Sequence, residues 1–230
     1  AYLNGSGTKY IYMAFADKRE YAYWLDQSGN NNDWTSNNLT ESDISVDSPT
    51  NNFCTMNPLN AQTADKMSEG NLFVDAANRC CATMAVSSGK WYFEVFLKYQ
   101  HHGGLGLGIR EVGGTIVNDT GINQVSMSHP VGSGVQVNKV VNGSSSTDGE
   151  VGTVPNGVII GISFDVDAQT ISFKSNNSAI HSSLTNFDYS ACSNMETVTP
   201  FLSIPGGRQV IVNFGQDSSF AGTKTAQGNQ

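Results

Sequence analysis

Apolar and polar side chains alternate along much of residues 71–216, and this pattern constrains the fold more than any other feature of the sequence. The run KWYFEVFLKY (90–99) places every second side chain on one face, as a β-strand does. Two further runs, VIIGISF (158–164) and TISFKS (170–175), flank a short polar segment that predicts a tight hairpin loop. Strand signals separated by turns about every ten residues are typical of an antiparallel sandwich or barrel.

Local signals refine this expectation. GVQVNKVV (134–141) leads into Asn142–Gly143, a preferred two-residue hairpin turn. GLGLGI (104–109) has its bulky residues on one face and glycines between them, so another backbone or layer can approach closely. The single helical candidate is AQTADKM (61–67), which has room for one or two turns. We expect the aromatic rings of residues 90–99 to be buried between the sheets rather than to form a sugar-stacking platform.

The charge balance excludes some classes of protein. The net charge is −8 and charged residues make up only 14% of the chain, against roughly 25% in an average domain. The basic residues are scattered singly, whereas nucleic-acid binding needs clusters of lysine and arginine. No apolar stretch approaches the ~20 residues of a membrane span. We therefore expect neither nucleic-acid binding nor membrane insertion.

The ordered motifs GKWYFEVFL, GLGLGI, VIIGISFDVDAQTISFKSNN, PFLSI and VNFGQ resemble the landmarks of a SPRY (B30.2-like) domain. That resemblance implies an all-β fold, a concanavalin-like antiparallel β-sandwich. The lead-in DQSGNNNDWTSNN…DSPTNNFCTMNPL resembles the segment that precedes SPRY-like domains in bacteriophage tail-fibre and other virion structural proteins. Residues 121–134 depart from the pattern, because they lack the aromatic-rich loop common in cellular SPRY domains.

These patterns divide the chain into four parts. Residues 1–19 are predicted to be the terminal strand of an upstream domain or an inter-subunit arm. Residues 20–70 form a long irregular lead-in packed on the sandwich, residues 71–217 form the SPRY-like sandwich, and residues 218–230 form a polar C-terminal tail. Because the strand in residues 1–19 has no partner within the chain, it is expected to pair with a neighbouring subunit. Tyr10, Tyr12 and Phe15 are its candidate assembly residues.

No motif predicts catalysis, a metal or a cofactor. Asp165 and Asp167 could open a calcium loop, but the position of its bidentate acid is the neutral Asn176, so a hairpin turn is favoured. Glu94 and Glu111 are the least implausible carboxylate pair for glycoside hydrolysis, although the sequence cannot show that they converge. The four cysteines lack zinc-ligand spacing and are expected to be buried free thiols. The chain is predicted not to be an enzyme.

The recognition residues are predicted in loops, which can vary without disturbing a rigid core. The candidate loops span residues 100–104, 118–130 and 142–149. The candidate partner-binding residues are Tyr99, Gln100, His101, His102, Asn118, Asn123, His129 and Asn142.

The resemblance implies a non-enzymatic virion protein, located in the particle: a tail-fibre, receptor-binding or decoration module. Its partners would be other virion proteins and copies of itself, and a host-surface glycan or protein. The alternatives are a carbohydrate-binding module of a secreted or surface protein, a polysaccharide-degrading enzyme and a cellular SPRY adaptor. Glycan binding by the isolated protein would favour the first of these, sugar release the second, and capture of a short peptide the third.

Overall fold

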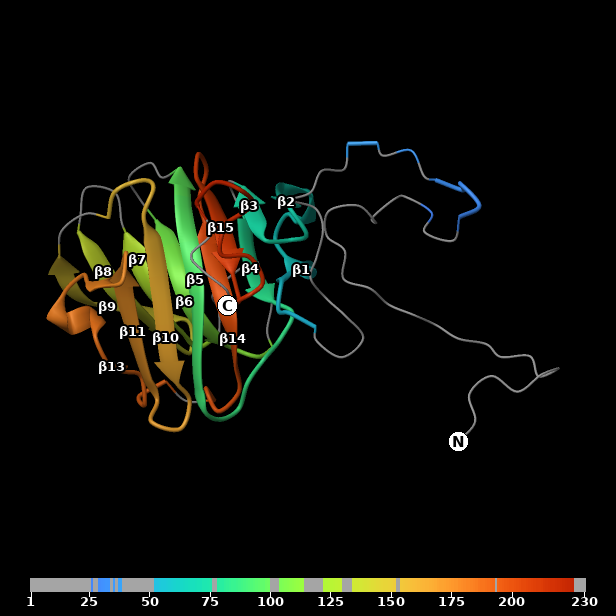
Figure 1. The fold of residues 1–230 in the computed structure, drawn as a ribbon. Helices are drawn as coiled ribbons and strands as arrows, with labels where there is room; N and C mark the ends of the chain where they lie inside the picture. Colours follow the sequence, from blue (N-terminus) through green and yellow to red (C-terminus); the bar gives the residue numbers. More distant parts are fainter. Residues whose placement is uncertain are drawn as a thin grey trace, which may run out of the picture.

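A computed structural model describes residues 26, 29–33, 35, 37–38, 52–75, 78–99, 104–113, 122–129, 134–151, 154–192 and 194–225. This part of the chain is almost entirely β-structure (Figure 1). The strands are β1 (Met56–Ala61), β2 (Met67–Ser68), β3 (Phe73–Asp75), β4 (Asn78–Ala82), β5 (Lys90–Tyr99), β6 (Leu105–Glu111), β7 (Gln124–His129), β8 (Val135–Val141), β9 (Ser144–Val151), β10 (Ile159–Asp165), β11 (Thr170–Ser175), β12 (Ser178–Ala179), β13 (Phe187–Asp188), β14 (Val198–Ile204) and β15 (Gln209–Asn213). Two short 3-10 helices, η2 (Ala64–Lys66) and η3 (Ser182–Leu184), complete the described elements.

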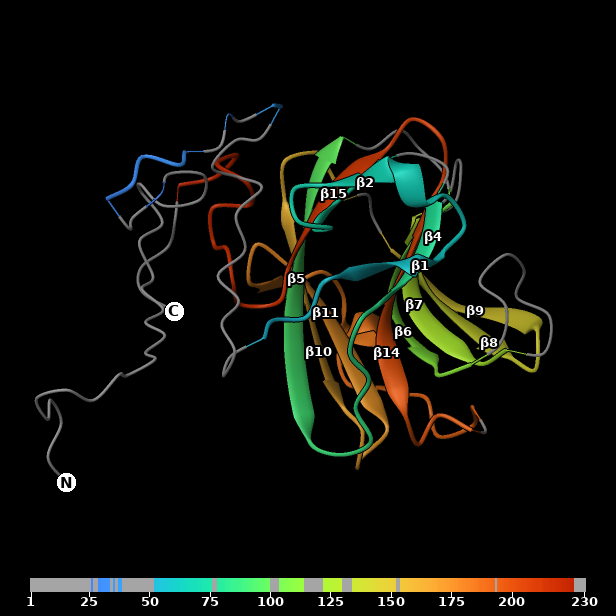
Figure 2. The ribbon, with the colours of Figure 1, turned by 90° about the vertical axis from the view of Figure 1, so that its right-hand side faces the viewer.

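The strands form two antiparallel sheets that pack face to face, seen edge-on in Figure 2. The seven-stranded sheet has the order β1-β4-β14-β6-β7-β8-β9. The eight-stranded sheet has the order β12-β11-β10-β5-β15-β3-β2, with β13 paired to β11. The predicted all-β concanavalin-like sandwich is therefore confirmed.

The core lies between the sheets and is filled by the alternate side chains that the sequence pattern marked. Phe93, Val95 and Leu97 of β5 are almost completely buried, and they share one cluster with Leu107 of β6 and Met127 of β7. Fully burying a side chain of this size stabilises a fold by about 1.5–3 kcal/mol. The alternating aliphatic and aromatic side chains therefore supply the apolar contacts that stabilise the packing of the two layers.

Glycine is required in β6 by the close approach of β7. A Cβ atom on Gly108 would lie 2.1 Å from the carbonyl oxygen of Val125 and 2.6 Å from the Cα of Ser126. Both neighbours are backbone atoms that a side-chain rotation cannot move. The glycine pattern of residues 104–109 therefore serves close packing, as the sequence predicted.

Both predicted hairpins are observed. Asn142 and Gly143 connect β8 to β9 with φ values of 49° and 81°, the left-handed conformation that an asparagine–glycine turn favours. The predicted loop after Asp165 joins β10 to β11, which begins at Thr170. The helical candidate 61–67 is reduced to η2, because Ala61 belongs to β1 and pairs with Cys80 of β4.

Four segments differ from the predictions. Residues 56–61 and 67–68 of the predicted irregular lead-in form strands β1 and β2, one in each sheet. Most of the predicted loop 118–130 that the structure describes is strand β7, in the interior of its sheet. Most of the predicted loop 142–149 is strand β9. The predicted polar tail is a packed segment as far as the structure describes it, to residue 225, and its Phe220 is only 1% exposed. In each case pairing or apolar contacts that the local composition does not reveal order the segment: β1 pairs with β4, β7 pairs with β6 and β8, β9 pairs with β8, and Phe220 packs on Phe96 and Ile211.

The cysteines occupy the predicted kind of environment. All four are free thiols, and Cys80, Cys81 and Cys192 are buried whereas Cys54 is only partly buried. Cys80 points into the main core and Cys81 packs with Phe201 in a separate cluster. Burial raises the pKa of Cys81 to about 11, so this thiol is protonated at neutral pH.

Each described helix has three residues, too short to cross a membrane.

Candidate functional site

The start of β5 lies at one end of the sandwich, which we call the hairpin end. The hairpin end carries the β8–β9 turn, the β10–β11 turn and the segment 83–89 that links the two sheets. That segment is fixed to both layers: Val86 pairs with Val198 of β14, and the amide of Val166 donates to the carbonyl oxygen of Gly89 at 3.0 Å. Strand β5 then runs to Tyr99 at the opposite end.

Large apolar side chains gather at the hairpin end. Of the six exposed ones in the described residues, Met84, Trp91, Tyr92 and Val112 belong to this end, while Leu59 lies on the edge strand β1 and Tyr99 at the far end of β5. Trp91 is 48% exposed and Tyr92 is 59% exposed. Exposed tryptophan and tyrosine side chains with a well-packed support are typical of protein recognition surfaces.

A hydrogen bond from the indole N–H fixes the Trp91 side chain. Its indole Nε1 donates to the carbonyl oxygen of Ser88 at 2.8 Å. Gly89 lies beneath the ring with a φ of 84°, and a Cβ atom there would be 3.6 Å from the indole nitrogen. The amide of Gly89 in turn donates to Asp167 Oδ2 at 3.0 Å. The exposed ring is therefore fixed before any partner arrives.

Tyr92 points to the opposite face of β5, the outer face of the eight-stranded sheet, and is fixed in a similar way. Its hydroxyl donates to Glu94 Oε1 at 2.8 Å, and Asn213 Nδ2 donates to Glu94 Oε2 at 3.2 Å. The ring lies over Gly161 of β10, where a Cβ atom would be 2.6 Å from the tyrosine oxygen. Burial of its hydroxyl and the bond to Glu94 raise the pKa of Tyr92. Tyr92 therefore stays neutral and donates its hydrogen bond at all physiological pH values.

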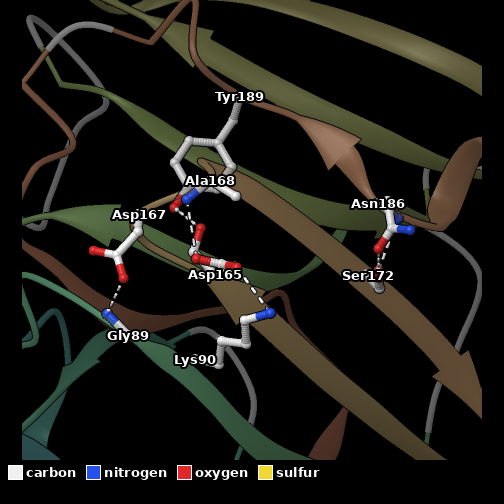
Figure 3. A network of polar contacts seen from close by, with 8 residues as sticks. All are labelled: Gly89, Lys90, Asp165, Asp167, Ala168, Ser172, Asn186 and Tyr189. Carbon is white, nitrogen blue, oxygen red and sulfur yellow. Dashed lines mark hydrogen bonds and ion pairs between the residues drawn. The ribbon is translucent and has the colours of Figure 1, made fainter.

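A polar network stabilises the adjacent β10–β11 turn (Figure 3). The Asp165 carboxylate accepts the amide of Ala168 at 3.0 Å and lies 3.4 Å from Lys90 Nζ. Tyr189 donates its hydroxyl to the Asp165 carbonyl oxygen at 3.4 Å. The Ala168 amide is the main reason that the pKa of Asp165 is lowered, with Lys90 contributing further. Asp165 and Asp167 thus serve the turn, as the sequence analysis favoured.

Some predicted recognition residues lie outside the residues that the structure describes, namely Gln100, His101, His102 and Asn118. The predicted assembly residues also lie outside them, namely Tyr10, Tyr12 and Phe15. Tyr99 is 45% exposed, at the end of the sandwich opposite to Trp91. The backbone of His129 pairs with Leu105 in the sheet. Among the described residues the candidates thus lie at two places: Tyr99 and His129 belong to the end opposite the hairpin end, whereas Asn123 and Asn142 lie together at the hairpin end.

Asn123 has a structural role in place of the predicted partner contact. It is fully buried, its Nδ2 donates to Glu111 Oε2 at 2.9 Å, and its Oδ1 accepts the amide of Asn142 at 3.0 Å. Its backbone amide also donates to Glu111 Oε1 at 3.0 Å. Asn142 is exposed but forms the hairpin turn. Asn123 is a correction to the predicted site, because a side chain with no exposed surface cannot contact a partner.

The two glutamates that the sequence offered as a carboxylate pair lie on different sheets. Glu94 belongs to β5 and Glu111 to β6, and each is bonded to an asparagine of its own. Among the residues described, no three His, Cys, Asp or Glu side chains gather as they would around a metal ion. Glu94 and Glu111 are therefore held by separate structural contacts on different sheets.

The prediction that the aromatic rings of residues 90–99 are buried between the sheets is wrong for Trp91, Tyr92 and Tyr99, all of which are exposed. Alternation alone predicts burial of only one face of β5. A signal was present: both neighbouring positions at the start of the strand are aromatic, so they cannot share one face. One of the two had to lie away from the core. Trp91 is exposed for a different reason, since it lies at the end of the sandwich where the layers stop.

Comparison with known proteins identifies the class. The model of the SPRY domain family matches residues 90–217, more than half of the chain. The chain therefore belongs to the SPRY family, whose members are generally non-catalytic and typically mediate protein–protein interactions.

Two solved structures of SPRY domains match this chain. The SPRY domain of human HERC1 has a TM-score of 0.49 and 19% identity, over 70% of this chain and 99% of that one. The PSpry domain of TRIM65 has a TM-score of 0.46 and 13% identity, over 70% of this chain and 92% of that one. No match was found among curated proteins.

Proposed function

We propose that this chain is a non-catalytic recognition module that binds a protein partner through the hairpin end, with Trp91 and Tyr92 as its main contacts. The observation that carries this proposal is the combination of exposure and support. Both rings present about half of their surface to solvent, and both are fixed by hydrogen bonds from their polar atoms.

Rigid exposed rings favour binding for a thermodynamic reason. Ordering a flexible side chain on association costs roughly 0.5–1.5 kcal/mol, and Trp91 and Tyr92 are already ordered by Ser88 and Glu94. Met84 and Val112 add apolar surface at the same end. Lys90, which is 85% exposed, and Asp165 supply charges beside the rings. An apolar centre with a polar rim is the usual anatomy of a protein interface.

The contacts of the described reactive groups support a role without catalysis. Burial raises the pKa of each thiol, including that of the partly buried Cys54. The carboxylates Glu94 and Glu111 are bonded to asparagines on separate sheets. A nucleophile with a nearby base is the usual requirement of covalent catalysis. The contact of this kind between His181 Nδ1 and Ser183 Oγ, 2.9 Å long, belongs to the cap of η3, where His181 also accepts the amide of Ser183.

The experiment compares alanine variants at the two ends of β5. A peptide-display library is selected on the wild-type protein, and the affinity of the selected peptide is measured for Trp91→Ala, Tyr92→Ala and Tyr99→Ala. Removing an interface anchor should weaken binding about 30-fold at either ring of the hairpin end. Tyr99→Ala is the matched control, since Tyr99 is comparably exposed on the same strand.

The outcome distinguishes the two ends. Loss of binding in Tyr99→Ala, with Trp91→Ala and Tyr92→Ala unaffected, would contradict the proposal and favour the predicted loop that follows β5. Circular dichroism and thermal melting of each variant verify that the fold is retained. Tyr92→Phe keeps the ring and removes the bond to Glu94, so it separates ring contact from preorganisation.

Exposed aromatic rings also favour a second candidate, a carbohydrate-binding module, since rings of this kind stack on sugars. A glycan array probed with wild type and Trp91→Ala tests it. Binding to a glycan that Trp91→Ala loses, together with no peptide selected from the library, would favour the carbohydrate function over the protein partner.

The resemblance of the lead-in to phage proteins extends the proposal to a particular setting. We propose that the module is a virion component, a tail-fibre, receptor-binding or decoration protein that assembles with copies of itself and other virion proteins. Its support is the sequence of residues 26–59, of which the structure describes only parts. Sedimentation of the chain with purified phage particles tests this setting, and its absence from them would contradict it.

A further inference from the structure

An apolar row crosses the outer face of the eight-stranded sheet, away from the hairpin end. Ile211 of β15 pairs with Phe73 of β3 on one side and with Phe96 of β5 on the other, and Phe96 pairs with Ile159 of β10. Four neighbouring strands thus contribute one apolar side chain each. We call Phe73, Phe96, Ile159 and Ile211 the outer apolar row.

Residues 217–225, the C-terminal strap, cover this row. Phe220 is 1% exposed and shares a cluster with Phe96 and Ile211, its ring centre 5.8 Å from that of Phe96. Lys224 places its Nζ 4.7 Å from the centre of the Phe96 ring and donates to the carbonyl oxygen of Gly157 at 2.7 Å. The Phe220 ring and the Lys224 ammonium group, four residues apart, therefore both contact the ring of Phe96.

The strap folds on itself through a few polar contacts. The Asp217 carboxylate accepts the amides of Ser219 at 2.8 Å and Ala221 at 2.6 Å. Phe220 and Ala221 have φ values of 51° and 54°, a left-handed conformation that residues with a Cβ atom disfavour. The strap therefore keeps a strained backbone in place through the burial of one ring and the contacts of one lysine.

The limits of the family match set the strap apart from the domain. Phe96, Ile159 and Ile211 lie within the matched residues 90–217, whereas Phe220 and Lys224 follow them. A segment that continues beyond the family domain thus occupies a surface that belongs mainly to the domain.

We propose that the outer apolar row is a second docking surface, and that the strap is an internal ligand that occupies it until a peptide of the same chemistry replaces it. The chemistry is an aromatic side chain followed four residues later by a lysine. The residues of this surface differ from the proposed contacts at the hairpin end. A chain of hydrogen bonds joins the two places, since Asp217 donates its amide to Asn213, which donates to the Glu94 that holds Tyr92. Strain in the strap lowers the cost of its release, and tethering keeps it bound in the absence of a competitor.

The test uses the full chain and a labelled synthetic peptide with the sequence of residues 214–225, FGQDSSFAGTKT. In wild type the strap competes with the peptide for the outer apolar row. The apparent affinity for the peptide is therefore the intrinsic affinity multiplied by the fraction of molecules whose row is free. The Phe220→Ala variant keeps the strap but removes its anchor. It should bind the peptide at least about tenfold more tightly than wild type does.

Two controls should bind less, in contrast to the tighter binding expected of Phe220→Ala: an altered peptide and the variant Ala221→Gly. A peptide with alanine in place of its second phenylalanine should not bind. Ala221→Gly relieves the backbone strain, so it should hold the strap more firmly and bind the peptide more weakly than wild type. Equal binding by wild type and a folded Phe220→Ala, or no binding by the folded variant, would overturn the proposal.

Hydrogen exchange of the wild-type chain keeps the test decisive should Phe220→Ala fail to fold. The amides of Ala221 and Lys224, bonded to Asp217 and Ser219, report on the strap. The amide of Val212, bonded to Leu72, reports on the sheet. The strap amides should exchange at least about tenfold faster, because local opening needs less free energy than global unfolding. Equal protection would show that the strap opens only when the sheet unfolds, and would overturn the proposal.

Discussion

Replacing Asn123 by alanine should destabilise the sandwich without any loss of a binding residue. The change removes the bond from Asn123 Nδ2 to the Glu111 carboxylate, 2.9 Å long, and the bond from the Asn142 amide to Asn123 Oδ1, 3.0 Å long. The bond from the backbone amide of Asn123 to Glu111 survives, since alanine keeps that amide.

The magnitude follows from the two lost bonds. A hydrogen bond to a charged group contributes about 1.5–3 kcal/mol and a neutral one about 0.5–1.5 kcal/mol. Glu111 is only partly buried and Asn142 is exposed, so water replaces part of what is lost. We expect the free energy of unfolding to fall by about 2–3 kcal/mol. For a domain of this size that lowers Tm by about 4–12 °C.

Urea unfolding followed by tryptophan fluorescence measures the change. Asn138→Ala is the matched control: this asparagine lies on the neighbouring strand β8 and accepts one exposed bond from Ser145 at 2.7 Å. Asn138→Ala should lower the free energy of unfolding by less than about 1 kcal/mol. Equal stabilities for Asn123→Ala and Asn138→Ala would refute the reasoning. Asn123→Asp places a second carboxylate against Glu111, so its defect should shrink at low pH as one of the pair is protonated.

Two further predictions test the packing and the pH dependence. Gly108→Ala brings a Cβ atom to 2.1 Å from a backbone oxygen of β7, so it should lower the free energy of unfolding by more than about 3 kcal/mol; a wild-type urea midpoint would contradict this. The pKa of Asp165 is lowered below 3.8 in the folded state, mainly by the Ala168 amide. Its carboxylate therefore contributes stability above that pH, and the contribution is lost as the pH falls through the folded pKa. Urea unfolding should show Asp165→Asn to be less stable than wild type at neutral pH, with a smaller difference at pH ~2.5, whereas a constant difference would exclude this linkage.

The sandwich itself was predictable because its signals are local. Alternation in KWYFEVFLKY identifies β5, and Asn142–Gly143 identifies the β8–β9 turn, since each pattern fits one backbone conformation. By contrast, QVSMSH (124–129) and SSSTDGEV (144–151) read as loop sequence but form strands β7 and β9. Their strand structure comes from pairing with neighbours, and strand propensity depends strongly on such context.

The candidate site was less predictable than the fold. Asn123 has the composition of a surface loop residue, and only the distant carboxylate of Glu111 accounts for its burial. Arg110 is 1% exposed and lies 5.6 Å from the Phe201 ring, although arginines are rarely buried to this extent. No local pattern distinguishes such residues from exposed ones, because their partners lie elsewhere in the sequence.

By itself the sequence determined the antiparallel sandwich, the strands with strong alternation such as β5, β10 and β11, and the SPRY family to which the chain belongs, because period-two alternation and turn chemistry act between near neighbours. Only the tertiary structure decided which surfaces remain open to a partner. Trp91 and Tyr92 are exposed because the layers end beside one and Gly161 lies beneath the other, while Phe220 is buried because β15 presents Ile211 beside Phe96. Exposure depends on what packs above a residue, and that neighbour is fixed by the arrangement of the sheets rather than by adjacent sequence.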